Sequence, residues 1–133
     1  CDTPLTVEHA AALAGYLQAL CSYLLEGNEP PPREDDYLVY NYNRFQACRF
    51  GLEGSIVLPQ AHESRPLRDD ILGTLERIAP HAERLGAGPA LAHLAQVARD
   101  GGDAWQLRAV HEREGSVESL VNLALRRFRG ADS

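Results

Sequence analysis

Apolar residues recur every three or four positions along most of this chain, and prolines and glycines divide the pattern into separate segments. Such a pattern is typical of amphipathic helices joined by short connections. The segments expected to be helical are residues 6–27, a second segment from 35 or 36 to 51 or 54, and residues 66–88, 89–102, 103–115 and 116–128. Five or six helices with short links predict a mainly α fold, a helical bundle in which residues 55–58 supply at most one short strand.

Residues with particular backbone preferences mark the ends of these helices. Thr6, Asp103 and Ser116 are expected N-caps, because their side chains can accept a hydrogen bond from the first helical turn. Pro80 is expected to kink or restart the helix that contains it. Consecutive prolines make residues 28–34 a stiff linker between the first two helices.

Core candidates are the apolar residues that share one face of each expected helix. For the first helix they are Val7, Ala10, Leu13, Leu17, Leu20, Cys21 and Leu24. For the helices between residues 66 and 115 they are Leu67, Ile71, Leu75, Ile78, Leu91, Leu94, Ala95, Ala98, Trp105, Ala109 and Val110. For the last helix they are Val117, Leu120, Val121, Leu123, Ala124 and Phe128.

The length of 133 residues predicts a single helical domain, 1–133, with a core of its own. The formal net charge is −6 and the arginines lie among acidic residues, which disfavours nucleic acid as a partner. The longest apolar run, residues 10–25, is interrupted by polar residues and falls short of the about 20 that cross a bilayer, so no membrane partner is expected. The three cysteines show neither metal-ligand nor disulfide spacing and indicate reduced thiols in a cytoplasmic protein.

The chain starts at Cys1 and contains no methionine, which predicts a fragment or a processed form of a longer protein. Truncation is one interpretation. A lipoprotein that has lost its signal peptide is another, because such a protein would also begin with cysteine. The sequence upstream of Cys1 would distinguish the two.

The stretch YNYNRFQACRFGLEG mixes aromatic rings with asparagines and arginines. At about 100° per residue, a helix through it places seven side chains within an arc of roughly 140°. They are Tyr37, Leu38, Asn41, Arg44, Phe45, Cys48 and Arg49. An unpaired buried guanidinium is costly, so this face is not expected to be wholly covered. Arg44 and Arg49 could then bind phosphate or carboxylate oxygens at the rim of a cleft. Alternatively, they could pair with Asp36, Glu53 or Glu63.

The remaining polar residues give weaker signals. Residues 60–66, which include a His-Glu pair, are expected to form a solvated loop. His81, His93 and His111 have no metal-ligand spacing and are expected on helix surfaces, so no metal site is predicted. Cys48 has no neighbouring histidine to activate it as a nucleophile.

Four sequence blocks carry a resemblance to a known family. They are CDTPLT, NRFQACRFGL, APHAERLG and AWQLRAV, in this order. The series resembles the C-terminal part of the type 2 glutamate-cysteine ligase family, whose members are also called carboxylate-amine ligases. The resemblance covers nearly the whole chain.

This resemblance implies that the chain is the helical C-terminal portion of a larger, glutamine-synthetase-like α+β ligase. The implied reaction uses ATP and Mg²⁺ to activate a carboxylate as an acyl phosphate, which an amine then attacks. The usual substrates are glutamate and cysteine, as in glutathione biosynthesis. The carboxylates that hold the metal are expected before Cys1, so the fragment should be inactive alone and bind no cofactor tightly.

The family pattern also implies roles for particular residues. Arg44 and Arg49 are the implied catalytic residues. Asn43, Arg44, Arg49 and Arg108 are the implied substrate-binding or phosphate-binding residues. The implied partners are small-molecule substrates and the missing N-terminal part of the same chain, and a homo-oligomer stays open. The alternative function is a non-catalytic helical interaction domain whose aromatic and arginine-bearing face binds an acidic partner.

Overall fold

The computed structural model describes residue 4 and residues 6–27, 33–59 and 63–130 of the chain. Within these ranges it contains six α-helices, one short 3-10 helix and one two-stranded antiparallel sheet. The elements in order are α1 (Val7–Glu26), α2 (Glu34–Phe50), η1 (Gly51–Glu53), β1 (Ser55–Val57), β2 (Ser64–Pro66), α3 (Leu67–Arg84), α4 (Gly88–Asp100), α5 (Gly102–Glu114) and α6 (Val117–Phe128). The prediction of a mainly helical fold with five or six helices is therefore confirmed.

The sheet differs from the sequence-based expectation. β2 lies in the segment expected to be a loop, so the described chain contains two strands where at most one was predicted. Ile56 of β1 faces Arg65 of β2 in the antiparallel register. Pro66, which has no N–H to donate, is the last residue of its strand, where a proline is tolerated.

The helix ends follow local chemistry at most positions. The side chains of Thr6 and Ser116 accept backbone N–H groups of the first turn, at 3.0 and 3.4 Å, and both predicted N-caps are confirmed. Asp103 is not an N-cap, because α5 already begins at Gly102. The preceding residue, Gly101, has a φ of 100°, a conformation that glycine adopts at little cost. Most of the predicted 28–34 linker lies outside the described residues.

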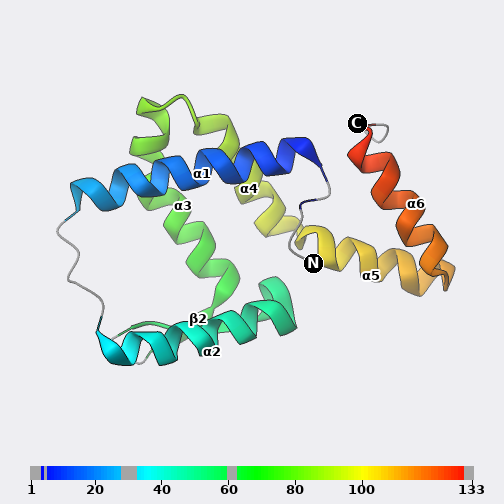
Figure 1. Ribbon diagram of the computed structural model, residues 1–133, viewed down its shortest axis with the longest axis horizontal. Coiled ribbons are helices and arrows are strands. Elements are labelled where there is room, and N and C mark those ends of the chain that lie inside the picture. Colours follow the sequence, from blue (N-terminus) through cyan, green and yellow to red (C-terminus); the bar gives the residue numbers. More distant parts are fainter. Residues whose placement is uncertain (1–3, 5, 28–32, 60–62, 131–133) are drawn as a thin grey trace.

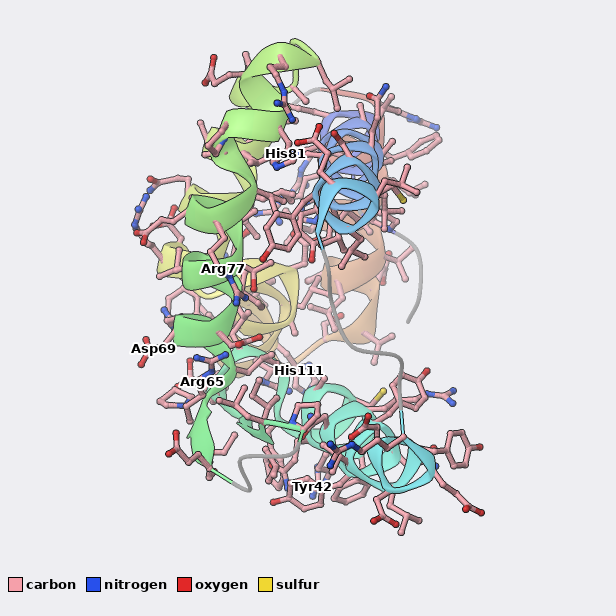
Figure 2. The ribbon with its side chains drawn as sticks, turned by 90° about the vertical axis from the view of Figure 1, so that its left-hand side faces the viewer. Tyr42, Arg65, Asp69, Arg77, His81 and His111 are labelled. Atoms are coloured by element: carbon pink, nitrogen blue, oxygen red, sulfur yellow. The ribbon has the colours of Figure 1, made fainter. Side chains whose placement is uncertain are left out.

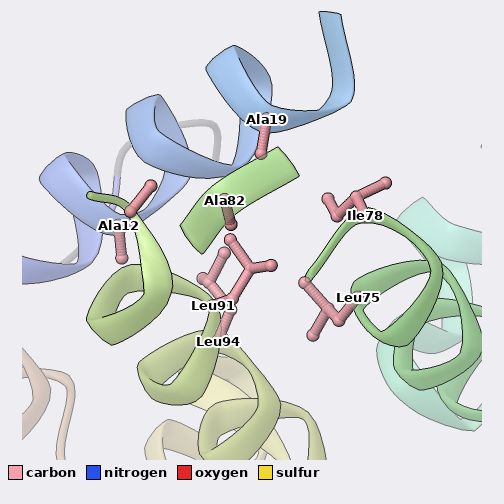
Figure 3. Packing of buried hydrophobic residues seen from close by; sticks show 8 residues of the cluster. Ala12, Ala19, Leu75, Ile78, Ala82, Leu91 and Leu94 are labelled. Carbon is pink, nitrogen blue, oxygen red and sulfur yellow. The ribbon is translucent and has the colours of Figure 1, made fainter. Parts of the chain in front are cut away.

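The main core lies between α1, α3 and α4, which pack on one another in Figure 1. Its buried members are Ala12, Ala19, Leu75, Ile78, Ala82, Ala87, Leu91 and Leu94. Figure 3 shows Ala12 and Ala19 of α1 facing the leucines and isoleucine of the other two helices. Ile78 and Ala82 of α3 and Ala19 of α1 are completely buried, so the centre of this core lies where α3 meets α1.

The buried face of α1 is not the one predicted from its leucines. Leu13, Leu17 and Leu24 are exposed, whereas Ala12 and Ala19 are buried. Small residues let neighbouring helix backbones approach closely, and the short side chains of α1 therefore face α3 and α4. Leu17 and Leu24 lie outside the core, whereas Leu13 lines an apolar cavity beside it and Leu20, also predicted, packs against it.

Pro80 does not restart a helix, because α3 continues through it from Leu67 to Arg84. A proline inside a helix removes one hydrogen bond to the carbonyl four residues earlier, here that of Glu76. Both residues lie on the exposed side of α3. Solvent can therefore hydrate the freed carbonyl.

α5 and α6 contact each other more extensively than they contact the three-helix core, and Figure 1 shows them extending away from it. Only one side of each helix is therefore covered. Trp105, Val117, Val121 and Phe128, all predicted to be buried, are exposed. Among the described residues, no helix has the length and apolar character required to cross a membrane.

Candidate functional site

The helix that carries the predicted site, α2, is attached to the rest of the chain mainly through β1 and η1. Figure 1 shows it lying along the sheet, below the three-helix core. It begins at Glu34, one or two residues earlier than predicted, and the carboxylate of Asp36 accepts the N–H of Arg33 at 2.7 Å. None of its residues is buried. The site is therefore built on a helix with a broad exposed surface.

Asn43 joins α2 to the outer edge of β1. Its side-chain amide donates to the carbonyl of Val57 and accepts the N–H of the same residue, both at 2.8 Å. The amide thus makes the two hydrogen bonds that a neighbouring strand would make. The described hydrogen bonds of Asn43 are directed to β1, and its role in binding substrate or phosphate stays a prediction.

Arg44 and Arg49 extend from the opposite, exposed side of α2. All seven side chains of the predicted arc are exposed, which confirms that this face is not wholly covered. The guanidinium of Arg49 lies over the ring of Phe50, with its carbon 5.8 Å from the ring centroid. This contact is a cation–π interaction and leaves the N–H groups at the edge of the guanidinium free to bind oxygen.

The carboxylates proposed as alternative partners are not paired with these arginines in the described part of the chain. Glu53 binds Arg68, at 2.5 Å, and Asp36 caps the start of α2. No ion pair or hydrogen bond to a carboxylate is present at Arg44 or Arg49 within residues 33–59 and 63–130. The structure therefore presents both guanidinium groups to solvent.

Arg108 is not brought together with the other three predicted site residues. It lies on α5, whose main neighbours are α6 and α4, and its side chain is exposed. With Leu107, His111 and Leu120, it lines a shallow cavity of about 230 Å³ between α5 and α6. Its predicted role in binding substrate is untested by this placement.

Two arginines that no sequence pattern singled out hold the sheet and η1 to the core. Arg68 donates to Glu53 and to the backbone carbonyl of Arg99 at 2.7 Å, which links η1, α3 and the end of α4. Arg65 forms an ion pair with Asp70. Glu53 and Arg68 are far apart in sequence, and no local spacing predicts their contact.

His81 is not a surface histidine as predicted. Its side chain is 12% exposed, and its Nδ1 lies 3.0 Å from the hydroxyl of Ser22 and 2.9 Å from Nη2 of Arg84. Its ring also meets the ring of Tyr23 edge to face, with centroids 5.5 Å apart. Figure 2 shows His81 directed from α3 toward α1. These contacts are consistent with a role in holding the two helices together.

A second polar region lies between the start of α1 and the ends of α4 and α6. A cavity of about 470 Å³ is lined there by His9, His93, Asp103 and Arg127, among other residues. The rings of His9 and His93 meet edge to face, with centroids 5.6 Å apart. Arg127 lies 3.7 Å from Asp103. No local sequence spacing groups these residues, because they come from four different helices.

An apolar cavity of about 330 Å³ opens beside Tyr16, between α1, α3 and α4. Burial is the main cause that raises the pKa of Tyr16, and the negative charge of Asp70 acts in the same direction. Arg77 lowers the pKa and partly opposes these effects.

Within the described ranges, no group of three or more His, Cys, Asp or Glu side chains is placed to hold a metal ion.

Comparisons with known proteins agree on one family. The family described as glutamate-cysteine ligase family 2 matches residues 1–123. A Legionella pneumophila (strain Lens) protein named "Putative glutamate--cysteine ligase 2-1" is 56% identical over 131 residues, which are 98% of this chain and 35% of that protein. A Paraburkholderia xenovorans protein named as a ligase of the same type is 54% identical over 121 residues, 90% of this chain and 33% of that protein. The chain thus spans about a third of the length of these curated relatives.

Proposed function

Because this chain belongs to glutamate-cysteine ligase family 2, we propose that it is the helical portion of an ATP-dependent enzyme that joins a carboxylate to an amine. The acid and amine in this proposal are glutamate and cysteine or related compounds. The single observation that carries it at the level of residues is the exposure of Arg44 and Arg49 on α2, without a carboxylate partner among the described residues.

The chemistry of arginine suits this role. Its planar fork of N–H donors matches the oxygens of a phosphate or a carboxylate, and it stays charged at any physiological pH. In the proposed reaction, a carboxylate oxygen attacks the terminal phosphorus of ATP and ADP leaves. The amine nitrogen then attacks the acyl carbon, loses a proton and displaces phosphate. Arg44 and Arg49 would hold negative oxygens in place and stabilise charge on the transferring group.

The described residues do not fit a Mg²⁺ site, because they contain no suitable group of carboxylates. We therefore place the metal on the part of the ligase outside this chain and assign no step through it to these residues. This chain alone is accordingly proposed to lack turnover. Arg108, on a different helix, stays a candidate substrate-binding residue.

The test measures ATP-dependent phosphate release by the full-length parent ligase, with glutamate and cysteine as substrates. Arg44→Ala and Arg49→Ala are each expected to lower kcat/KM by about 100-fold, the usual effect of removing one donor that stabilises transition-state charge. Arg44→Lys should lose less, because it keeps the charge and loses only the planar fork.

Arg113→Ala is the matched control, since Arg113 is also exposed and pairs only with its neighbour Glu114 among the described residues. It should leave kcat/KM unchanged. Less than a twofold loss in both α2 variants would contradict the proposed role of these arginines. Turnover by this chain alone would contradict the placement of the metal site elsewhere.

A further inference from the structure

The exposed surface of α2 carries several large apolar side chains, where the surface of an isolated domain would be mainly polar. The side that faces β1 carries Asp36, Val39, Asn43 and Gln46, which are partly covered. At about 100° per residue these four side chains occupy an arc of roughly 80°. The helix therefore turns a mainly polar stripe toward its own sheet.

The opposite side holds most of the large side chains of this helix. We call it the outer surface of α2, and define it by Tyr37, Leu38, Tyr40, Tyr42 and Phe45, with the polar or charged Asn41, Arg44 and Arg49 and the thiol of Cys48 between them. These residues span an arc of roughly 200°. Tyr37 and Leu38 are 66% and 68% exposed, and the other three apolar members are also exposed. The rings of Tyr37 and Tyr40 stack with centroids 6.3 Å apart.

Large exposed groups of apolar side chains mark interaction sites on many proteins, and the outer surface of α2 carries five of them on one helix. Tyrosine, phenylalanine and arginine are also enriched at protein interfaces, and tyrosine and arginine often contribute most to binding there. The outer surface of α2 combines all three types on one helix. Its composition therefore fits a protein partner better than it fits solvent.

We propose that the outer surface of α2 is covered by the remaining part of the parent ligase. The relatives are about three times as long as the matched region, which is 35% of the Legionella protein, so a parent of that length would contain enough chain to cover this surface. The inference rests on family membership and on the exposure of α2, and it does not require the proposed reaction. It also accounts for the weak attachment of α2, whose described contacts are mainly with β1 and η1.

Two other occupants are less well supported. A second copy of the chain could pair α2 with α2 in opposite directions, with the acidic first turn of one near Arg44 and Arg49 of the other. Such a dimer would pair the guanidinium groups with carboxylates of the second copy. The outer surface of α2 would then be unavailable to the rest of the ligase. An acidic protein would be repelled by the three carboxylates of the first turn. Both alternatives are outcomes of the experiment below.

Cys48 provides a natural probe, because it is a free, exposed thiol in the middle of the outer surface. Cys21 on α1 is also free and exposed, and it serves as the internal reference. The rate of alkylation of each cysteine is measured by peptide mass spectrometry, for this chain and for the full-length parent ligase, without nucleotide. Cys48 is expected to react readily in this chain and at least 10-fold more slowly, relative to Cys21, in the parent.

A pair of matched variants gives an independent measurement. Phe45 and Phe128 are both exposed phenylalanines, at 58% and 64%, and only Phe45 belongs to the outer surface. Phe45→Ser should leave the Tm of this chain within about 2 °C but lower that of the parent by 5 °C or more. Phe128→Ser should leave the Tm of both nearly unchanged.

Equal reactivity of Cys48 in this chain and in the parent, relative to Cys21, would overturn the proposal and favour a separate protein partner. A dimer of this chain in which Cys48 is protected, with a reactive Cys48 in the parent, would overturn it in favour of a second copy. Protection can be measured in a parent without ligase activity. Failure of the proposed reaction and failure of this interface are therefore distinguishable.

Discussion

Replacement of Asn43 should detach the edge of β1 from α2. The two hydrogen bonds to Val57 are both 2.8 Å long, and Asn43→Ala removes both. A typical hydrogen bond contributes about 1 kcal/mol net. The free energy needed to open the contact between α2 and β1 should therefore fall by about 2 kcal/mol. Val57 is partly exposed, and water that reaches its backbone would reduce this value.

The assay is amide hydrogen exchange measured by NMR, which reports local opening at the N–H of Val57. A loss of about 2 kcal/mol corresponds to an exchange rate about 30-fold faster. The amide of Leu58, which donates to the carbonyl of Glu63 in the hairpin at 2.8 Å, should change less. Urea denaturation of the same variant measures the effect on global stability.

Asn43→Asp is the matched variant, because a carboxylate can still accept the N–H of Val57 but cannot donate to its carbonyl. It should therefore keep more protection at the Val57 amide than Asn43→Ala does. If neither variant accelerates exchange at Val57, the amide does not hold β1, and the assignment of Asn43 as the link between α2 and the sheet is wrong.

Two further predictions concern the three-helix core. A Cβ added at Gly15 would lie 2.9 Å from the Cβ of Ala90, so Gly15→Ala should destabilise the chain by about 1–3 kcal/mol in urea denaturation. Adding Ala90→Gly to this variant should recover part of that loss, because it removes the clashing Cβ. If the effects of the two substitutions simply add, α1 and α4 are not in close contact at this point. Burial raises the pKa of Tyr16 above 10.0 and so favours the neutral phenol in the folded state. The contribution of the neutral phenol to the free energy of unfolding is therefore complete below pH 10 and declines as the pH rises through the folded-state pKa. Tyr16→Phe should remove this part of the alkaline loss, and identical curves of unfolding free energy against pH, measured between about pH 8.5 and 11, would count against the raised pKa.

The open arginine face of α2 was predictable because it depends on residues close together in the sequence. Arg44 and Arg49 lie within a single helical stretch, and a helix with guanidinium groups on that face cannot bury it without partners. The link between Asn43 and Val57 was not predictable in the same way. It depends on the path of the chain through η1, which returns β1 to the side of α2.

The packing of α1 shows a similar limit. Its leucines indicated one buried face, yet Ala12 and Ala19 form the buried side. A residue's hydrophobicity says that its burial is favourable, but the distance to the neighbouring helix decides whether a large side chain fits. Here the small side chains permit a closer approach of α3 and α4.

The amino-acid sequence by itself determined the helices, most of their ends and the family to which the chain belongs, because helical periodicity, capping and characteristic sequence blocks are local properties. Only the tertiary structure decided which faces are buried, how Arg68 links η1 to α3 and α4, and which apolar surface of α2 stays open. These features depend on contacts between residues far apart in the chain. Such contacts form only when packing brings whole elements together.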